Sequence, residues 1–233
     1  MARKLSFSVS ECYHIYNRGT EKRDIFLDKA DYLRFIVSLY ISNNTDVMHI
    51  SNLINQGETL MKILNMDKKG SLVDIGAYCL MPNHFHLLVK EKTENGISKF
   101  MSKLTTGYSM YFNKRYDRTG RLFEGTFKSV HADSDEHLKY LFAYIHLNPI
   151  KLINPVWKEE GIRNSVEAKL FLNGYSFSSY LDYTMKARNN GKRPESKILN
   201  KNVFPEYFST EKDFESFINY WLLFNNTNIK VQP

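Results

Sequence analysis

Two histidines separated by one hydrophobic residue constrain this chain more than any other feature. His84-Phe85-His86 opens an apolar run that predicts a β-strand over 84–90, joined to a strand over 72–79 through the turn Met81-Pro82-Asn83. Because side chains two apart on a strand face the same way, both imidazoles project from one face and Phe85 points into a core on the other. Two neutral nitrogen donors held side by side suit a divalent metal ion. The strand therefore predicts half of a metal site.

A second segment, Tyr140 to Pro149, offers groups that could complete the site. Its apolar pattern is helical, and because a residue before proline is disfavoured in the helical conformation, the helix is predicted to end at Asn148. Tyr144 and Asn148 lie four apart and share a face, where they supply a phenol and a neutral oxygen donor. Tyr140 lies one turn earlier on the same face and is an alternative nucleophile. His146 faces elsewhere.

The distribution of charge points to nucleic acid as a partner. The chain carries 32 Lys and Arg against 25 Asp and Glu, and basic residues between Met101 and His131 are interleaved with aromatic ones. This combination is typical of a groove that follows phosphates and stacks bases, although a solvated helix face with core aromatics would show the same composition. The candidate phosphate contacts are Arg18, Arg115, Arg121 and Lys128.

The order of the predicted elements defines the fold class as α+β. Predicted strands cover 12–17, 72–79, 84–90 and 126–131, and predicted helices cover 29–40, 96–115 and a segment that starts near 133–136 and ends at Asn148. We expect a mostly antiparallel sheet of four to five strands with helices packed on it.

This pattern also divides the chain into two parts. Residues 1–155 form the predicted catalytic domain, in which the polar stretch 43–70 is an insertion with a short helix around 58–65. Residues 156–233 form an extension with a basic linker over 185–201 and a terminal helix that starts at Ser209 or Thr210.

Composition excludes several other classes of protein. No apolar stretch approaches the roughly 20 residues needed to cross a bilayer, so we expect a cytoplasmic protein. Cys12 and Cys79 both lie in strand-like apolar surroundings, which favours buried thiols over a disulfide framework or a zinc knuckle.

Taken together, these motifs resemble a known family. The pairing of 81–88 with 144–149 is similar to the one-tyrosine HUH transposases, the insertion-sequence-200-like group, and especially to its REP-associated tyrosine transposase branch. The segments 13–19, 120–128 and 175–180 agree as well, so the resemblance spans about 13 to 180. It implies a ferredoxin-like or RRM-like HUH domain.

The resemblance also implies a reaction. A metal ion on His84, His86 and Asn148 would bind a phosphate oxygen, and Tyr144 would attack the phosphorus to form a covalent 5′-phosphotyrosine link that can be rejoined. The ligand types suit Mg²⁺ or Mn²⁺, with zinc left open. The expected substrate is hairpin-bearing single-stranded DNA, because a duplex holds its backbone stiffly. Whether the chain acts as a monomer or as a homodimer stays open.

Two other functions fit the same residues less closely. A domesticated relative could bind DNA hairpins without cutting them, although a binder has no need of all four residues His84, His86, Tyr144 and Asn148. A metal-dependent phosphodiesterase could use water as its nucleophile. A covalent adduct that depends on Tyr144 would separate the transposase from both.

Overall fold

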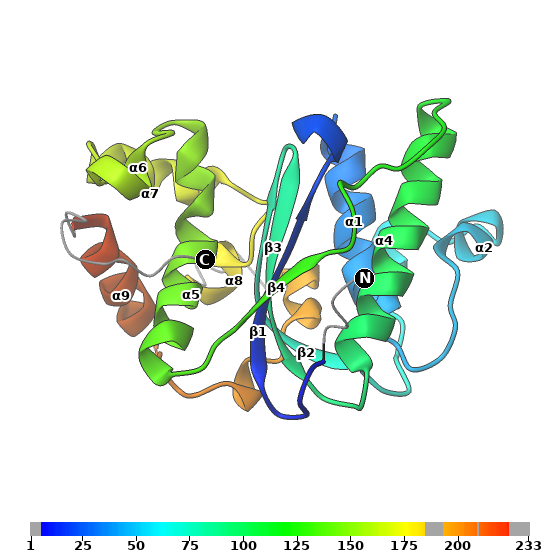
Figure 1. Cartoon of the computed structure of the whole chain (residues 1–233), viewed down its shortest axis with the longest axis horizontal. Helices are drawn as coiled ribbons and strands as arrows, with labels where there is room; N and C mark the ends of the chain where they lie inside the picture. Colours follow the sequence, from blue (N-terminus) through cyan, green and yellow to red (C-terminus); the bar gives the residue numbers. More distant parts are fainter. Residues whose placement is uncertain (1–5, 185–192, 209, 224–233) are drawn as a thin grey trace.

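A four-stranded antiparallel sheet separates two groups of helices in the computed structural model of this chain (Figure 1). The structure describes residues 6–184, 193–208 and 210–223. The strands are β1 (Cys12–Arg18), β2 (Val73–Met81), β3 (His84–Glu91) and β4 (Lys128–His131), in the order β2-β3-β1-β4. With α1 (Lys29–Ser42) after β1 and α4 (Gly96–Arg115) after β3, they give the βαββαβ order of a ferredoxin-like fold. The predicted α+β class is confirmed, with four strands.

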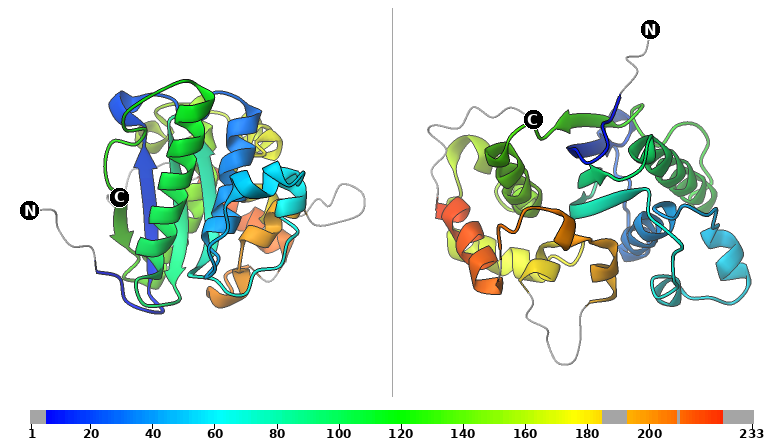
Figure 2. Two further views of the ribbon diagram at one scale, coloured as in Figure 1. Left: turned by 90° about the vertical axis from the view of Figure 1, so that its right-hand side faces the viewer. Right: turned by 90° about the horizontal axis from the view of Figure 1, so that it is seen from below.

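The first helical layer contains α1 and α4 and rests on the face of the sheet that carries Phe85, Leu87 and Val89 (Figure 2). Asp28 caps the start of α1 by accepting hydrogen bonds from the backbone of Ala30 and Asp31. The carboxylate of Glu91 accepts from the first backbone N–H groups of α4, which fixes this helix to the end of β3. The fully buried rings of the layer form a core with the strands.

The second layer covers the opposite face of the sheet and is centred on α5 (Asp135–Leu147). Ser134 caps α5 by accepting from the backbone N–H of His137. The α-helix ends at Leu147, one residue before the predicted end, and the chain continues as the 3₁₀ turn η2 (Asn148–Leu152). Pro149 is tolerated there because the backbone N–H groups at the start of a helical turn have no acceptor within the turn, so the N–H that proline lacks is not missed.

Helices from the last third of the chain pack around α5 in this second layer (Figure 1). They are α6 (Trp157–Glu160), α7 (Ser165–Gly174), α8 (Tyr180–Tyr183) and α9 (Glu211–Leu223). The 3₁₀ turns η3 (Pro194–Ile198) and η4 (Lys201–Val203) lie between α8 and α9. The first part of the predicted basic linker, 185–192, and Ser209 lie outside the described residues. The extension and α5 therefore share one hydrophobic core.

The remaining short elements lie near the start of the sheet and beside α1. The turn η1 (Thr20–Lys22) follows β1, and α2 (Ile50–Asn55) and α3 (Leu60–Ile63) occupy the predicted insertion. Gly19 precedes η1 where a Cβ atom would lie 2.2 Å from the carbonyl oxygen of Arg23, so the chain can fold back only with glycine. No helix in the described ranges is long and apolar enough to cross a membrane.

The edge of β2 is covered by residues 175–183, which explains the Tyr-Ser-Phe-Ser-Ser-Tyr segment. Ser179 donates its backbone N–H to Tyr78 O at 2.9 Å and accepts the Tyr78 N–H on its hydroxyl at 2.9 Å. The same hydroxyl lies 2.8 Å from Nε2 of His146 on α5, whose Nδ1 donates to the carbonyl of Phe142. Because Nδ1 is the donor, Nε2 accepts from the Ser179 hydroxyl. An edge that would otherwise be open is closed and tied to α5.

We expect Ser179→Ala to destabilise the protein by about 1–3 kcal/mol, because it leaves buried partners on His146 and Tyr78 unpaired. The measurement is the free energy of unfolding from urea titration. Ser176→Ala is the matched control, since this serine of the same segment is exposed and should change stability by less than about 0.5 kcal/mol. Equal effects of the two substitutions would show that the Ser179 hydroxyl does not stabilise the contact between the β2 edge and α5.

Candidate active site

The two histidines of β3 face the second helical layer, as the strand periodicity predicts. His84 lies opposite Arg18 in the β1 register and His86 opposite Tyr16, while Phe85 between them is buried in the first core. His84 is half-buried at the hairpin end of the strand, and His86 is buried. The hairpin turn itself is held by Pro82 O, which accepts from two backbone N–H groups of the segment after η1.

Tyr144 projects from α5 onto these histidines. Its ring centroid lies 5.3 Å from that of His86, edge to face, and its side chain is 5% exposed. Tyr140, the alternative nucleophile, stacks on the outer side of Tyr144 with centroids 5.9 Å apart and also contacts Trp221 of α9. Of the two tyrosines, only Tyr144 is in ring contact with His86 among the described residues. All of these contacts are made within one chain.

Asn148 completes the group from the first position of η2. Its side chain is fully buried, and neither its Oδ1 nor its Nδ2 atom has a hydrogen-bond partner among the described residues. The amide lies close enough to His84 and Tyr144 to interact with their polar atoms, and this interaction offsets part of the effect of burial on the pKa of each. A buried amide without partners is costly unless a ligand satisfies it.

The unpaired atoms of the cluster fit a divalent cation. Nε2 of His86 is also buried and has no partner within residues 6–184, 193–208 and 210–223, so a ring nitrogen and an amide oxygen are available beside His84. The described residues contain no group of three His, Cys, Asp or Glu side chains that could hold a metal. A cation here would therefore depend on the oxygen of Asn148 and on oxygens of a substrate, as Mg²⁺ and Mn²⁺ accept.

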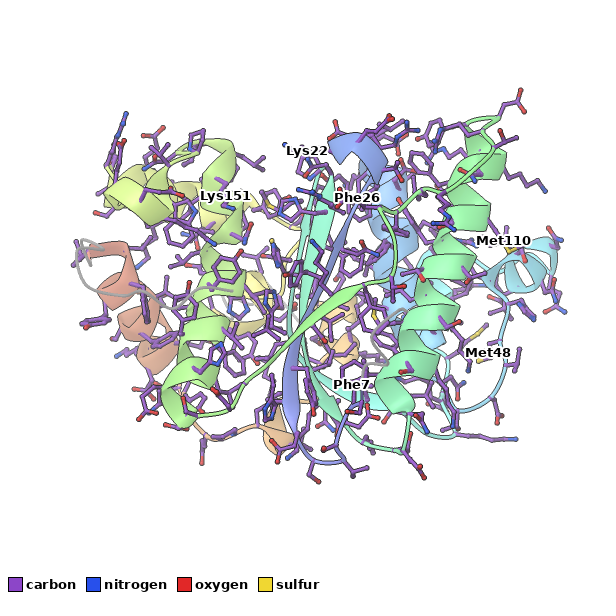
Figure 3. The ribbon with its side chains drawn as sticks, viewed as in Figure 1. Phe7, Lys22, Phe26, Met48, Met110 and Lys151 are labelled. Carbon is purple, nitrogen blue, oxygen red and sulfur yellow. The ribbon has the colours of Figure 1, made fainter. Side chains whose placement is uncertain are left out.

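The histidines are neutral, which is the form a metal requires. Burial, with a smaller contribution from the charge of Lys151, lowers the pKa of His84 to about 4. Burial also places the pKa of His86 well below its usual range, with contributions from His14 and His84. Figure 3 shows Lys151 and Lys22 on the upper side of the molecule, where the hairpin end of the sheet lies. Positive charge thus surrounds the open end of the cluster.

The phenol of Tyr144 is protonated at neutral pH. Burial raises its pKa above the usual value of 10, and the neighbouring Asn148 offsets only part of this rise. The ammonium of Lys158, from α6, lies 3.9 Å above the centre of the ring. This cation is placed to stabilise negative charge on the ring when the proton leaves.

The four predicted phosphate contacts lie in different surroundings. Lys128 is exposed and pairs with Tyr16, so it shares the face of the sheet that carries the histidines, and Arg18 on that face binds Glu124. Arg115 lies on the other side of the sheet, where it forms ion pairs of 2.6 Å with Asp28 and 2.8 Å with Asp31. A contact with DNA stays a prediction for all four residues, and it is least favoured for Arg115, whose guanidinium is already paired.

Arg121 lines a groove of about 450 Å³ between α4 and the loop before β4. Polar groups of α4 and the loop share the lining, with Thr105, Ser109, Asn113 and Thr126 among them. Gly125 O of the same loop accepts a hydrogen bond from Asn17, which fixes the loop to β1.

We expect Arg121→Ala to weaken binding of a single-stranded oligonucleotide and to reduce the slope of log K against log [salt] by about 0.7. Arg115→Ala should leave this slope unchanged, because its guanidinium is already held by two carboxylates. Fluorescence anisotropy at several salt concentrations measures both slopes. The reverse ranking would show that the Arg115 ion pairs open to DNA.

Sequence reasoning missed three residues that touch the cluster. His14 on β1 lies within hydrogen-bond distance of His86, Asn83 contacts His84, and Lys158 covers Tyr144. The alternation of β1 could have indicated His14, since it places this residue on the same face as Tyr16. Nothing local marks Lys158, which reaches the site only because α6 folds back beside α5.

Comparison with known proteins shows what this site is similar to. Residues 49–148, a little under half of the chain, match the sequence model described as "Transposase IS200 like", and this segment contains His84, His86, Tyr144 and Asn148. Within this segment the chain is similar to the IS200-like transposases, in agreement with the family that its motifs predicted. No curated protein matches the chain.

Solved structures resemble the chain at low sequence identity. A REP-associated tyrosine transposase bound to a REP hairpin is 11% identical with a TM-score of 0.46, covering 90% of this chain and 95% of that one. A candidate transposase from Deinococcus radiodurans is 16% identical with a TM-score of 0.34, covering 62% and 95%. The tRNA(His) guanylyltransferase of Saccharomyces cerevisiae is 10% identical with a TM-score of 0.36, covering 88% and 86%. All three TM-scores lie below 0.5.

Proposed function

We propose that this protein is a transposase-type strand transferase that cleaves and rejoins single-stranded, hairpin-bearing DNA through a covalent 5′-phosphotyrosine on Tyr144. The observation that carries the proposal is the contact of the Tyr144 ring with His86, beside a buried Asn148 amide that has no hydrogen-bond partner in the described part of the chain. A tyrosine with a purely structural role in a core would not be expected beside two buried polar groups without partners in the described residues, here the Asn148 amide and Nε2 of His86. The REP-associated branch stays part of this proposal.

In the proposed reaction, the hydroxyl oxygen of Tyr144 attacks the phosphorus of the scissile phosphodiester. The new bond joins this oxygen to phosphorus, the bond from phosphorus to the 3′-oxygen breaks, the phenol proton passes to solvent, and the leaving oxygen takes up a proton to become a 3′-hydroxyl. Reversal with another 3′-hydroxyl rejoins a strand. No high-energy cofactor is consumed, because one phosphodiester replaces another.

The residues around Tyr144 have separate tasks in this reaction. His84, His86 and Asn148 would hold Mg²⁺ or Mn²⁺, which when bound supplies positive charge at a non-bridging phosphate oxygen. Lys158 stabilises the phenolate character that develops on the ring during attack. Because Tyr144 itself is 5% exposed, the phosphate must approach from the end of the cluster at the half-buried His84.

The test uses the full chain and hairpin oligonucleotides labelled at the 3′ end, incubated with Mn²⁺, Mg²⁺ or chelator and then denatured. We expect labelled DNA to stay attached to the protein with either metal and to be absent with chelator. Cleaved DNA without an adduct would favour water as the nucleophile. Tight binding without cleavage of any hairpin would identify a DNA-binding protein that has lost transposase chemistry.

A further inference from the structure

Each of the two site histidines has one ring nitrogen tied to a neighbouring side chain, and in both cases it is Nδ1. His84 Nδ1 lies 2.6 Å from Oδ1 of Asn83, and His86 Nδ1 lies 2.8 Å from Nε2 of His14. A neutral imidazole carries one proton on its two nitrogens. If Nδ1 holds that proton and donates it, Nε2 keeps a lone pair. The neighbours of Nδ1 therefore decide which nitrogen can bind a cation.

For His84 the direction of the hydrogen bond follows from Asn83. The Nδ2 atom of Asn83 donates to the backbone carbonyl of Lys22 at 3.1 Å, which identifies the amide nitrogen and turns Oδ1 toward the ring. An amide oxygen only accepts, so Nδ1 of His84 must donate. The proton sits on Nδ1, and Nε2 keeps its lone pair.

For His86 the partner is a second histidine, which could accept or donate. His14 is fully buried on β1 and stacks on His86, with ring centroids 5.0 Å apart and planes inclined by 21°. Two ring nitrogens 2.8 Å apart hold one proton between them, so one ring donates and the other accepts. Each ring keeps a second buried nitrogen that has no partner in the described chain, Nδ1 of His14 and Nε2 of His86, so hydrogen bonding alone does not set the direction. The cation that the proposed function requires would set it, because a proton on Nε2 of His86 would block that atom. If His14 accepts, that atom presents a lone pair.

We infer that His14 and Asn83 are positioning residues that fix both site histidines as Nδ1–H tautomers and thereby aim two Nε2 lone pairs at one cation. The inference rests on the proposed function, in which these histidines bind a divalent cation. It assigns to His14 a role that its position on a neighbouring strand would not otherwise explain, since a histidine buried among rings has no advantage over phenylalanine. Partners of this kind hold ligand rings in place and change metal affinity by about 10- to 100-fold.

The first measurement needs neither metal nor DNA. Long-range ¹H–¹⁵N spectra of the metal-free, ¹⁵N-labelled full chain distinguish protonated from bare ring nitrogens, and with seven histidines the signals can be assigned by single substitutions. We expect a proton on Nδ1 and a bare Nε2 in both His84 and His86. A protonated Nε2 in either ring of the wild-type protein would overturn the inference for that ring, whatever the variants do.

The second measurement is the affinity for Mn²⁺ alone, by calorimetry without DNA. His14→Phe keeps a ring but removes the acceptor, so we expect the affinity to fall about 10- to 100-fold, and His14→Gln, which restores an acceptor, should recover most of the loss. Asn83→Ala and Asn83→Asp form the same pair for His84. If the two members of each pair lose affinity equally, or if neither loses any, the positioning role is wrong.

Failure of this inference differs from failure of the proposed function. A Tyr144-dependent adduct together with a protonated Nε2 on His86 would leave the transposase chemistry standing and remove the role of His14. Correct tautomers and Mn²⁺ binding without an adduct on any hairpin would do the opposite.

Discussion

Replacing Tyr144 by phenylalanine should abolish the covalent adduct with DNA, with a loss of at least about 10⁴-fold in the cleavage rate. The substitution removes the single oxygen proposed to attack phosphorus and leaves the ring against His86 and under Lys158. Since only a hydroxyl is lost, the free energy of unfolding should change by no more than about 1.5 kcal/mol. Rapid-quench cleavage with a labelled hairpin, followed by denaturing electrophoresis, measures the effect.

Tyr140→Phe is the matched control for this experiment. Tyr140 lies on the same helix and stacks on Tyr144, yet it faces Trp221 on its other side. We expect this variant to keep its adduct and to cleave at a rate close to that of the wild type. An adduct that survives in Tyr144→Phe and disappears in Tyr140→Phe would transfer the nucleophile to Tyr140. Survival of cleavage in both variants would point to water.

The sheet and its main helices could be predicted because local patterns decide them. The period of two around Phe85 places the histidines on one face, and the predicted helix over 96–115 agrees with α4. The strand predicted over 126–131 begins only at Lys128, since the chain before it follows the groove beside α4 instead of pairing with β1. Boundaries shift where tertiary contacts outweigh propensity.

The meeting of Tyr144 with His86 could be predicted only through the family resemblance, because no periodicity states how α5 lies across the sheet. Residues that act through a neighbouring side chain were harder still to predict from the sequence. His14 has the same pattern as a core residue of an ordinary strand, and Lys158 belongs to a helix of four residues in the extension. Such roles depend on the register between β1 and β3 and on the path of the chain after η2, which sequence spacing does not contain.

Residues after the predicted domain boundary at 155 pack in the same core as the helix that carries Tyr144. Phe214 and Ile218 of α9 belong to the same core as Tyr144, and Lys158 of α6 contacts its ring. The family match ends at Asn148, so these contacts come from outside the matched segment. The extension thus supports the helix that carries the proposed nucleophile, and its residues belong to the physical description of the site.

The second large effect is expected for His84→Ala. His84 stands at the open end of the cluster, where it would ligate the cation that lies against the phosphate, so its removal should lower the rate of adduct formation about 100- to 1,000-fold at low Mn²⁺. His86 and Asn148 remain, so raising the Mn²⁺ concentration should recover part of the rate. This recovery distinguishes a lost ligand from a lost fold, because an unfolded site would not respond to metal.

His131→Ala is the control for this change. His131 is an exposed histidine at the end of β4 that lies 2.8 Å from Glu11, outside the cluster, and its removal should leave both the rate and the Mn²⁺ dependence unchanged. The measurement is the rate of adduct formation over a range of Mn²⁺ concentrations for wild type and both variants. A wild-type metal dependence in His84→Ala would mean that the cation is held elsewhere, and the pairing of two imidazoles on β3 would then need an explanation unrelated to metal.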